Sequence, residues 1–186
     1  TSALIPRIRW VDSVSETPAS GTNPLGYLGG GRNSSGTPVS TVDKIDYSND
    51  TATASVAGSL TDGKRGVGAA GNNFFAYFAG GNSPSAGSVS SIDRLDYSSD
   101  STNTLSKGNL SFSNYGLDGV GNANFGYFAS SDYPLLSTVN RINYSNDTAS
   151  AAVKGPLSNP IDYGASAGNQ SFGYFAGGEV PSVTTT

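Results

Sequence analysis

Short segments that are apolar on both alternating faces recur along the chain, and each is followed by a segment that is apolar on one face only. Residues 74–79 read Phe-Phe-Ala-Tyr-Phe-Ala, so an extended segment here is apolar on both faces. In residues 43–47, Ile45 and Tyr47 share one face while Lys44 and Asp46 share the other. A strand that is apolar on both faces is covered on both faces, and a one-sided strand lies further out. No window carries the 3.6-residue period of a helix, so the pattern predicts an all-β fold of antiparallel hairpins.

The two-sided segment occurs four times, each time around a central tyrosine and mostly before a Gly-Gly pair. Its tyrosines are Tyr27, Tyr77, Tyr127 and Tyr174, which are 50, 50 and 47 residues apart. A fixed period in this range is typical of a repeat architecture. We therefore expect the central tyrosines to be core residues rather than a sugar-binding row.

The one-sided segment also recurs, as residues 43–51, 93–101 and 140–148, with the pattern Asp/Asn-Lys/Arg-Ile/Leu-Asp/Asn-Tyr-Ser. A worn copy lies at residues 6–12, where Trp10 takes the place of the tyrosine. From this aromatic residue to the next central tyrosine there are 30 residues in three units, but only 17 between Trp10 and Tyr27. The first unit is therefore shorter by about one strand and its turn.

Each full unit predicts four short strands. After the Gly-doublet and Asp-Tyr strands come a third strand, at residues 51–56 or 149–153, and a small-residue strand, at residues 66–70 or 164–167. The whole chain is then a single repeat domain with units of about 1–31, 32–81, 82–131 and 132–179 and a terminal segment, 180–186.

Such a repeat predicts a small β-propeller of about four four-stranded blades. Because the chain begins and stops inside a unit, the strand at residues 7–10 would complete the last blade. The same complementarity between two chains would instead build a filament, and an open array of β-repeats is the alternative to a ring.

The order of Gly-doublet strand, loop, Asp-Tyr strand and tight turn resembles the kelch-type propeller repeat, without the kelch tryptophan after the tyrosine. Residues 42–51, 92–101 and 139–148, with the four Gly-doublet segments, are more closely similar to tandem repeats of predicted tail-fibre and other structural proteins of bacteriophages, notably those of cyanobacteria. The similarity covers nearly all of the chain. It implies a virion or extracellular location and a structural role, with other virion subunits as partners and a homo-oligomeric assembly.

Composition narrows the possible chemistry. The chain has no histidine and no cysteine, which excludes Ser-His or Cys-His triads and His- or Cys-ligated metals. We expect no enzyme activity, no cofactor and no metal. The net charge is −4 without a basic patch, and no apolar run is long enough for a membrane helix, so neither nucleic acid nor a membrane is an expected partner. Because the chain has no methionine, we expect that Thr1 is not the translational start.

The recurring aspartates are predicted to be turn and surface residues. Asp50, Asp100 and Asp147 follow the Asp-Tyr strand and are expected to cap its tight turn, with calcium binding as the alternative. Lys44 and Asp46 are expected to pair across the exposed face of their strand.

These observations predict a non-enzymatic structural or adhesive module, such as part of a phage tail fibre, that binds host-surface glycans through its variable loops. The loops are residues 31–40, 81–90 and 130–138, and their candidate contact residues are Arg32, Asn33, Asn82, Asp132 and Tyr133. A self-assembling extracellular filament subunit is the alternative, and a polysaccharide-cleaving enzyme that uses aspartates is a third hypothesis.

Overall fold

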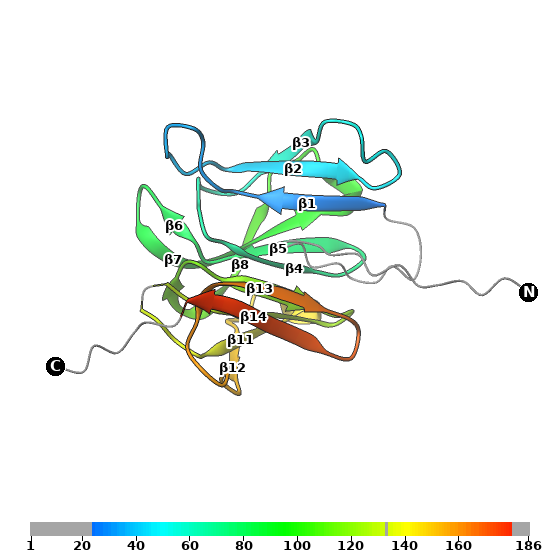
Figure 1. Ribbon diagram of the computed structural model, residues 1–186. Helices are drawn as coiled ribbons and strands as arrows, with labels where there is room; N and C mark the ends of the chain where they lie inside the picture. Colours follow the sequence, from blue (N-terminus) through cyan, green and yellow to red (C-terminus); the bar gives the residue numbers. More distant parts are fainter. Residues whose placement is uncertain (1–23, 133, 180–186) are drawn as a thin grey trace, which may run out of the picture.

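The chain folds into β-strands joined by turns and two short 3-10 segments, as a computed structural model of residues 24–132 and 134–179 shows (Figure 1). Tyr133 and the predicted strand at residues 7–10 lie outside these described residues. The elements are β1 (Leu25–Gly29), β2 (Thr41–Asp46), β3 (Ser55–Ser59), β4 (Gly68–Gly71), β5 (Phe75–Ala79), β6 (Asn82–Ser83), β7 (Gly87–Asp96), η1 (Tyr97–Ser99), β8 (Leu105–Asn114), β9 (Asp118–Gly121), β10 (Phe125–Ala129), β11 (Val139–Asn143), η2 (Tyr144–Asn146), β12 (Ala152–Lys154), β13 (Asp162–Gly168) and β14 (Gly173–Glu179).

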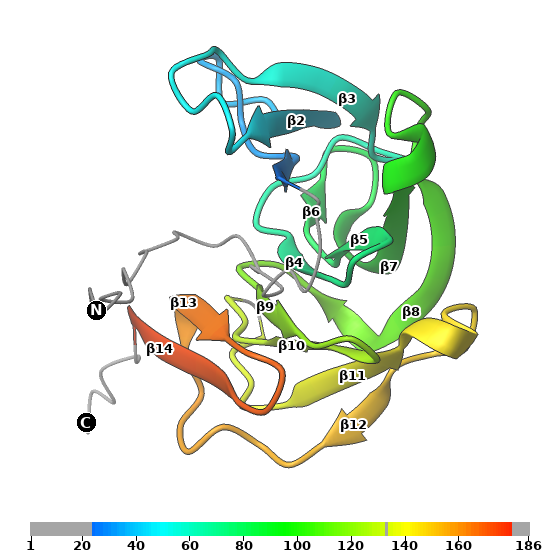
Figure 2. The same ribbon diagram turned by 90° about the vertical axis from the view of Figure 1, so that its right-hand side faces the viewer.

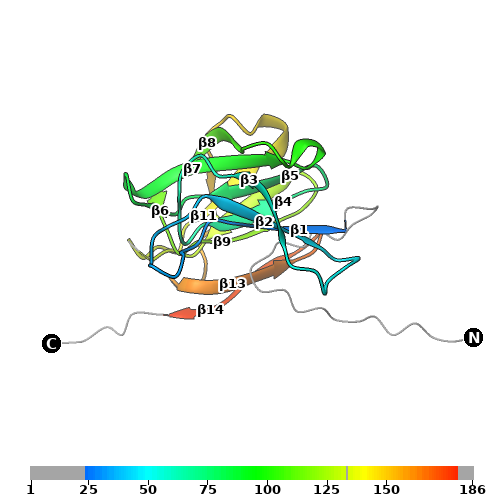
Figure 3. The same cartoon turned by 90° about the horizontal axis from the view of Figure 1, so that it is seen from above.

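The strands form four antiparallel sheets in chain order. The first sheet is β1-β2-β3, the second is β4-β5-β7-β8 with β6 beside β7, the third is β9-β10-β11-β12, and the fourth is the pair β13-β14. Figure 2 shows them following one another around an arc, with β4 and β9 toward its middle and β3, β8 and β12 toward its outside. Seen from above, β13 and β14 lie at one edge of the molecule (Figure 3).

The second and third sheets each contain the four kinds of strand that the repeat predicts, but each begins with the small-residue strand, β4 or β9, which the predicted unit placed last. The register repeats as well, since Tyr27 lies opposite Lys44, Tyr77 opposite Arg94 and Tyr127 opposite Arg141. Among the described residues the first sheet has three strands and the fourth has two, and the sheets do not close into a ring. The all-β prediction is confirmed, whereas the closed four-bladed ring stays a prediction.

The predicted third strand was placed several residues too early. It begins at Ser55 in the first sheet and at Ala152 in the third, because the residues before it belong to the turn. Ala52 donates its backbone N–H to the Asn49 carbonyl at 3.2 Å, which holds the chain in that turn.

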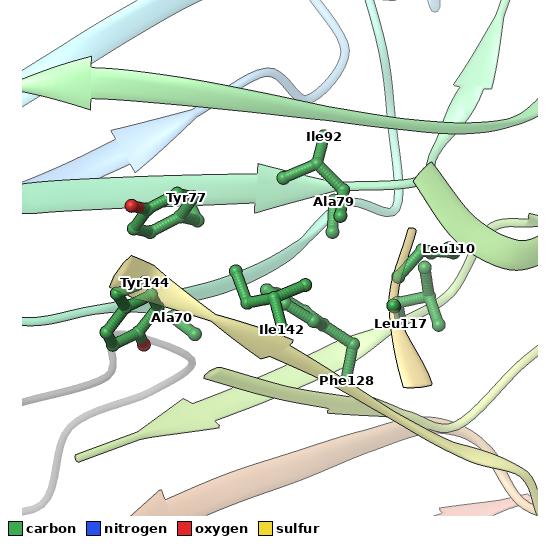
Figure 4. Close-up of a cluster of buried hydrophobic side chains, with 10 residues drawn as sticks. Ala70, Tyr77, Ala79, Ile92, Leu110, Leu117, Phe128, Ile142 and Tyr144 are labelled. Atoms are coloured by element: carbon green, nitrogen blue, oxygen red, sulfur yellow. The ribbon is translucent and has the colours of Figure 1, made fainter. Parts of the chain in front are cut away.

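Two apolar cores fill the spaces between neighbouring sheets. The core between the first and second sheets is built from Tyr27, Val42, Leu60, Ala76, Phe78 and Leu95. The core between the second and third sheets is built from Ala70, Tyr77, Ala79, Ile92, Leu110, Leu117, Phe128, Ile142, Tyr144 and Ala151 (Figure 4). Each sheet thus contributes one face to each neighbour, as expected for strands that are apolar on both faces.

The glycine doublets end the strands that carry the central tyrosines. Gly30, Gly80 and Gly177 have φ angles of 77°, 66° and 70°, which a side chain disfavours. Ser130 takes the equivalent place after β10 with a φ of 69°. The doublet therefore turns the chain out of the sheet, and this backbone requirement explains why the motif recurs.

Candidate functional site

A carboxylate from the second sheet, and one from the third, holds the tyrosine of the sheet before it. Asp100 follows η1 of the second sheet and accepts hydrogen bonds from the Tyr27 hydroxyl and the Lys44 ammonium, both at 2.8 Å. The Tyr27 ring stacks on Tyr97, with 4.8 Å between ring centroids. Although burial opposes ionisation, the hydrogen bonds from Lys44 and Tyr27 lower the pKa of Asp100. We call this arrangement of tyrosine, cation, stacked ring and aspartate the inter-sheet clamp.

A second inter-sheet clamp joins the second and third sheets. Asp147 accepts from the Tyr77 hydroxyl at 3.0 Å and from Arg94 at 2.8 Å, and Lys107 lies 3.5 Å away. The Tyr77 ring stacks on Tyr144 at 4.8 Å. Burial and the Asp147 charge raise the pKa of Tyr77, so its hydroxyl stays a donor across the physiological range.

The clamps correct two predictions about charged side chains. Asp100 and Asp147 do not cap their own turns, since their carboxylates bind the preceding sheet. The capping oxygens come from the residues just before the tyrosine, Asp46, Asp96 and Asn143, which accept the backbone N–H two residues later. Lys44 binds Asp100 of the second sheet instead of pairing with Asp46. The strand face that carries Lys44 packs against the second sheet rather than facing solvent, so the Asp100 carboxylate is within reach.

A second recurring contact joins the second sheet to the first and the third sheet to the second. Asp93 accepts the Thr61 backbone N–H, and Asn140 accepts that of Ser111 in the equivalent place. Asp93 also binds the Lys64 ammonium at 2.9 Å, and the two side chains are only 0% and 2% exposed. An ion pair buried this deeply fixes one geometry, because a lone charge there costs several kcal/mol.

The third interface, between the third and fourth sheets, is unlike the first two. Tyr77 is 0% exposed, whereas Tyr174 on β14 is 60% exposed. The prediction that the central tyrosines are core residues is therefore confirmed for Tyr27 and Tyr77 and wrong for Tyr174. A cavity of about 180 Å³ lies beside Tyr127 at this interface, against Gly173 and Phe175 of β14.

The variable loops and the connections between sheets meet at one end of the molecule, which we call the loop end. Gly31 donates to the Lys64 carbonyl, Gly81 to the Asn114 carbonyl and Ser131 to the Ile161 carbonyl, each at 2.8 Å. Each loop after a Gly-doublet strand is therefore anchored on the connection into the next sheet.

The structure separates the candidate loop residues rather than bringing them together. Arg32 and Asn33 are exposed, and the Asn33 side chain accepts from the Ser35 and Thr37 backbone within its own loop. Asn82 is half-buried, and its backbone is bound to Arg65 in both directions. These residues lie on different loops, so they do not form one contact surface.

Asp132 is the exception, because it lies within a cluster that sequence analysis missed. Its carboxylate accepts from the Tyr163 hydroxyl at 2.8 Å, and it raises the pKa of Tyr115 through a hydrogen bond. The Arg65 guanidinium lies over the Tyr115 ring, 4.8 Å from its centroid. We call Arg65, Tyr115, Asp132 and Tyr163 the loop-end cluster.

Tyr163 has an unusual backbone. It lies five residues before Gly168, in the place that Gly66 and Gly116 take before Gly71 and Gly121. The two glycines have φ angles of 64° and 72°, and Tyr163 has a φ of 45°. A tyrosine held in a glycine conformation is strained, and such strain gathers at functional positions. The sequence carries a signal for this position, because a tyrosine replaces the glycine that the other two units have there.

Asp118 is a buried acid at the start of β9, close to the loop-end cluster in sequence and fold. Burial raises its pKa to about 6, against the hydrogen bonds from Ser130 and the Gly164 backbone. One of its carboxylate oxygens is buried without a hydrogen-bond partner. Gly68 and Ala165 take its place in the neighbouring sheets, so this acid is a feature of one interface only.

Within residues 24–132 and 134–179 no group of three or more acidic side chains is arranged to hold a metal ion. No helix of these residues is long and apolar enough to cross a membrane.

No protein-family model matches the chain, and no curated protein matches it at a significant level.

Proposed function

We propose that the protein is a non-enzymatic structural and adhesive module of an extracellular or virion appendage, such as a phage tail fibre. Its four sheets would be the blades of a small propeller, with the N-terminal strand completing the last blade. The resemblance of the repeats to those of phage structural proteins supports this location. The inter-sheet clamps support the structural role, because they give the first and second sheets the same fixed contact as the second and third.

The adhesive role is carried by the loop-end cluster. Tyr163 is 56% exposed although its backbone is strained, and its hydroxyl is fixed by Asp132. Exposed tyrosine rings held beside a carboxylate and a guanidinium offer a stacking face and polar partners, which are the features of a saccharide site. The ligand class we propose is therefore a cell-surface glycan.

The variant Tyr163→Gly tests the adhesive role on a microbial glycan array. It removes the ring but restores the residue found at both equivalent positions, so the free energy of unfolding should change by less than about 1 kcal/mol. We expect glycan binding to be lost. Phe74→Ser is the matched control, since Phe74 is an exposed aromatic residue at the opposite end of β5.

Two outcomes would contradict the assignment. Glycan binding that is unchanged in both Tyr163→Gly and Asp132→Asn would remove the cluster as the site. Glycan binding that also survives replacement of loops 31–40, 81–90 and 130–138 would remove the loop end altogether.

A self-assembling filament subunit is the second candidate, and the open ends of the described sheets favour it. Phe172, just before β14, and Tyr174 within it are exposed aromatic residues, and β14 has a described partner strand on one edge only. An exposed strand edge is a template for another chain. Polymers seen by electron microscopy that fall apart into folded monomers when residues 1–10 are removed would support the filament over the single-chain ring.

A further inference from the structure

We infer that the cavity beside Tyr127 is a preformed socket for an indole ring, and that Trp10 of the same chain fills it when residues 5–10 pair with β14. The inference rests on the proposed propeller, and it names the contact that closes it. The term socket is used below for this cavity alone.

The socket corresponds to a place that a tyrosine ring fills in the neighbouring interface. Tyr144 stacks on Tyr77 and donates its hydroxyl to the Gly71 carbonyl at 3.2 Å. A Cβ atom on Gly126 would lie 2.9 Å from that hydroxyl, so the glycine makes room for the ring.

One repeat further along the chain, the same three positions surround the socket. Tyr127 corresponds to Tyr77 in the repeat, Gly121 to Gly71, and Gly173 to Gly126. All three line the cavity, together with Val120, Phe172 and Phe175. The equivalence of the lining residues identifies the missing occupant as an aromatic ring at the position of Tyr144.

The strand that should carry this ring is also missing from the described fourth sheet. β5 and β10 pair on both edges, with β4 and β7 and with β9 and β11, whereas among the described strands β14 pairs with β13 only. Arg94 and Arg141 of the corresponding strands lie over Phe75 and Phe125. Phe172, the counterpart of these two rings, is 64% exposed. An apolar strand with a free edge requires a partner.

The chain carries a segment with the required spacing. The corresponding strands of the first three sheets are β2, β7 and β11. Each has a buried aliphatic residue, a cation two positions later, an aliphatic residue next to the cation, and an aromatic ring two positions after that. The sets are Val42-Lys44-Ile45-Tyr47, Ile92-Arg94-Leu95-Tyr97 and Val139-Arg141-Ile142-Tyr144, and Ile5-Arg7-Ile8-Trp10 has the same spacing. Because Pro6 has no N–H to donate, we place the start of the ladder at Arg7.

Charge complementarity also favours this segment. Lys44 and Arg94 bind Asp100 and Asp147 of the following sheet. Around a ring, the sheet that follows the fourth is the first, whose corresponding residue is the exposed Asp50. Arg7 would be the cation for Asp50. Ser13 stands three residues after Trp10, where the other units have aspartate, so the Tyr127 hydroxyl gains no carboxylate there.

The connection is long enough for docking within one chain. From Trp10 to Pro24 there are 14 residues, which reach roughly 46 Å when extended. A compact domain of this length is roughly 40 Å across. The first described strand can therefore be reached from the socket without a second molecule.

Because Trp10 is the only tryptophan, its fluorescence reports on the socket in the full chain. We expect blue-shifted emission and several-fold weaker acrylamide quenching than in the urea-unfolded protein, both independent of protein concentration. Tyr127→Ala should return the quenching to the unfolded level, whereas Phe74→Ser should not. Emission typical of free indole in the folded monomer would overturn the inference.

An engineered disulfide tests the register independently of the fluorescence. The pairings of Phe75 with Asp96 and of Phe125 with Asn143 place Arg9 opposite Phe172. The chain has no cysteine of its own. We expect Arg9→Cys with Phe172→Cys to form a disulfide within one chain, because directly opposed strand residues lie within disulfide distance. The control pair Ile8→Cys with Phe172→Cys should stay reduced, since Ile8 lies on the other face.

The outcomes separate this inference from the proposed function. A disulfide between two chains, or one in the control pair only, would overturn intrachain docking and assign the socket to a second copy. Glycan binding measured on the same variants would stay unchanged in that case. A monomer that forms the intrachain disulfide but binds no glycan would instead overturn the adhesive role alone.

Discussion

The second and third interfaces of the molecule use the same tyrosine and arginine positions but differ in what surrounds them. Between the second and third sheets, Tyr77 is stacked on Tyr144 and held by Asp147. Between the third and fourth sheets, Tyr127 has the same backbone register but lies beside a cavity.

The difference shows that the burial of a central tyrosine is decided by the following sheet and not by its own strand. Arg94 and Arg141 both lie over the phenylalanine of their own sheet, 4.3 Å from the ring centroid, because that contact is internal to a sheet. The carboxylate and the stacked ring come from the neighbour. Each interface is therefore only as complete as the next unit makes it.

Lys64→Met should have the largest effect on stability, because the first interface carries a buried charge that the second replaces with Asn140. The substitution leaves Asp93 ionised and buried, and should lower the free energy of unfolding by about 3–5 kcal/mol in urea titrations. Adding Asp93→Asn, the amide that the third sheet already uses, should recover part of that loss. A Lys64→Met variant as stable as the wild type would show that water reaches the Asp93 carboxylate.

Asp118→Asn should have the next largest effect, and it should stabilise the protein. Since burial raises the pKa of Asp118 from 3.8 to about 6, the folded state keeps a proton that the unfolded chain loses between these pH values. The free energy of unfolding therefore falls by about 2 kcal/mol as pH rises from about 4 to above 6. The variant should lose this decline, so its advantage over the wild type should be about 2 kcal/mol larger at pH 7.5 than at pH 4. An equal advantage at both pH values would contradict the raised pKa.

Tyr77→Phe and Tyr127→Phe compare the complete and incomplete interfaces directly. Loss of the Tyr77 hydroxyl removes a hydrogen bond to a carboxylate and should cost about 1–2 kcal/mol. Loss of the Tyr127 hydroxyl should cost less than about 0.5 kcal/mol. Equal losses in denaturant titrations would mean that Tyr127 also donates to an acid, which would show the third interface to be as complete as the second.

Asn143→Ala should have a smaller effect than Tyr77→Phe, because the described hydrogen bonds of the Asn143 side chain lie within its own turn. It accepts from the Ser145 backbone N–H at 3.0 Å on the surface, and its loss should cost about 0.5–1 kcal/mol. Asp147→Ala, four residues later, should cost more, since it releases Tyr77 and Arg94 together. Thermal unfolding of the two variants in parallel would test whether local or inter-sheet contacts dominate in this turn.

The sequence by itself determined the all-β class, the antiparallel pairing of neighbouring strands and the place of most strands, although it put the third strand several residues too early. These follow from alternation, glycine positions and short-range turn chemistry, which act within a few residues of one another. It also determined the period of the repeat, because Tyr27, Tyr77 and Tyr127 recur in the same register.

Only the tertiary structure decided which residues meet across the sheets. The roles of Asp100 and Asp147 look like turn capping in sequence, because their partners Tyr27 and Tyr77 lie about 70 residues away in the chain. The loop-end cluster could not be predicted for the same reason, since Tyr115 and Asp132 lie in two different connections and Tyr163 lies at the start of β13. The strength of the Lys64–Asp93 ion pair and the pKa of Asp118 depend on how far the neighbouring sheets exclude water. This exclusion arises only when the sheets pack together.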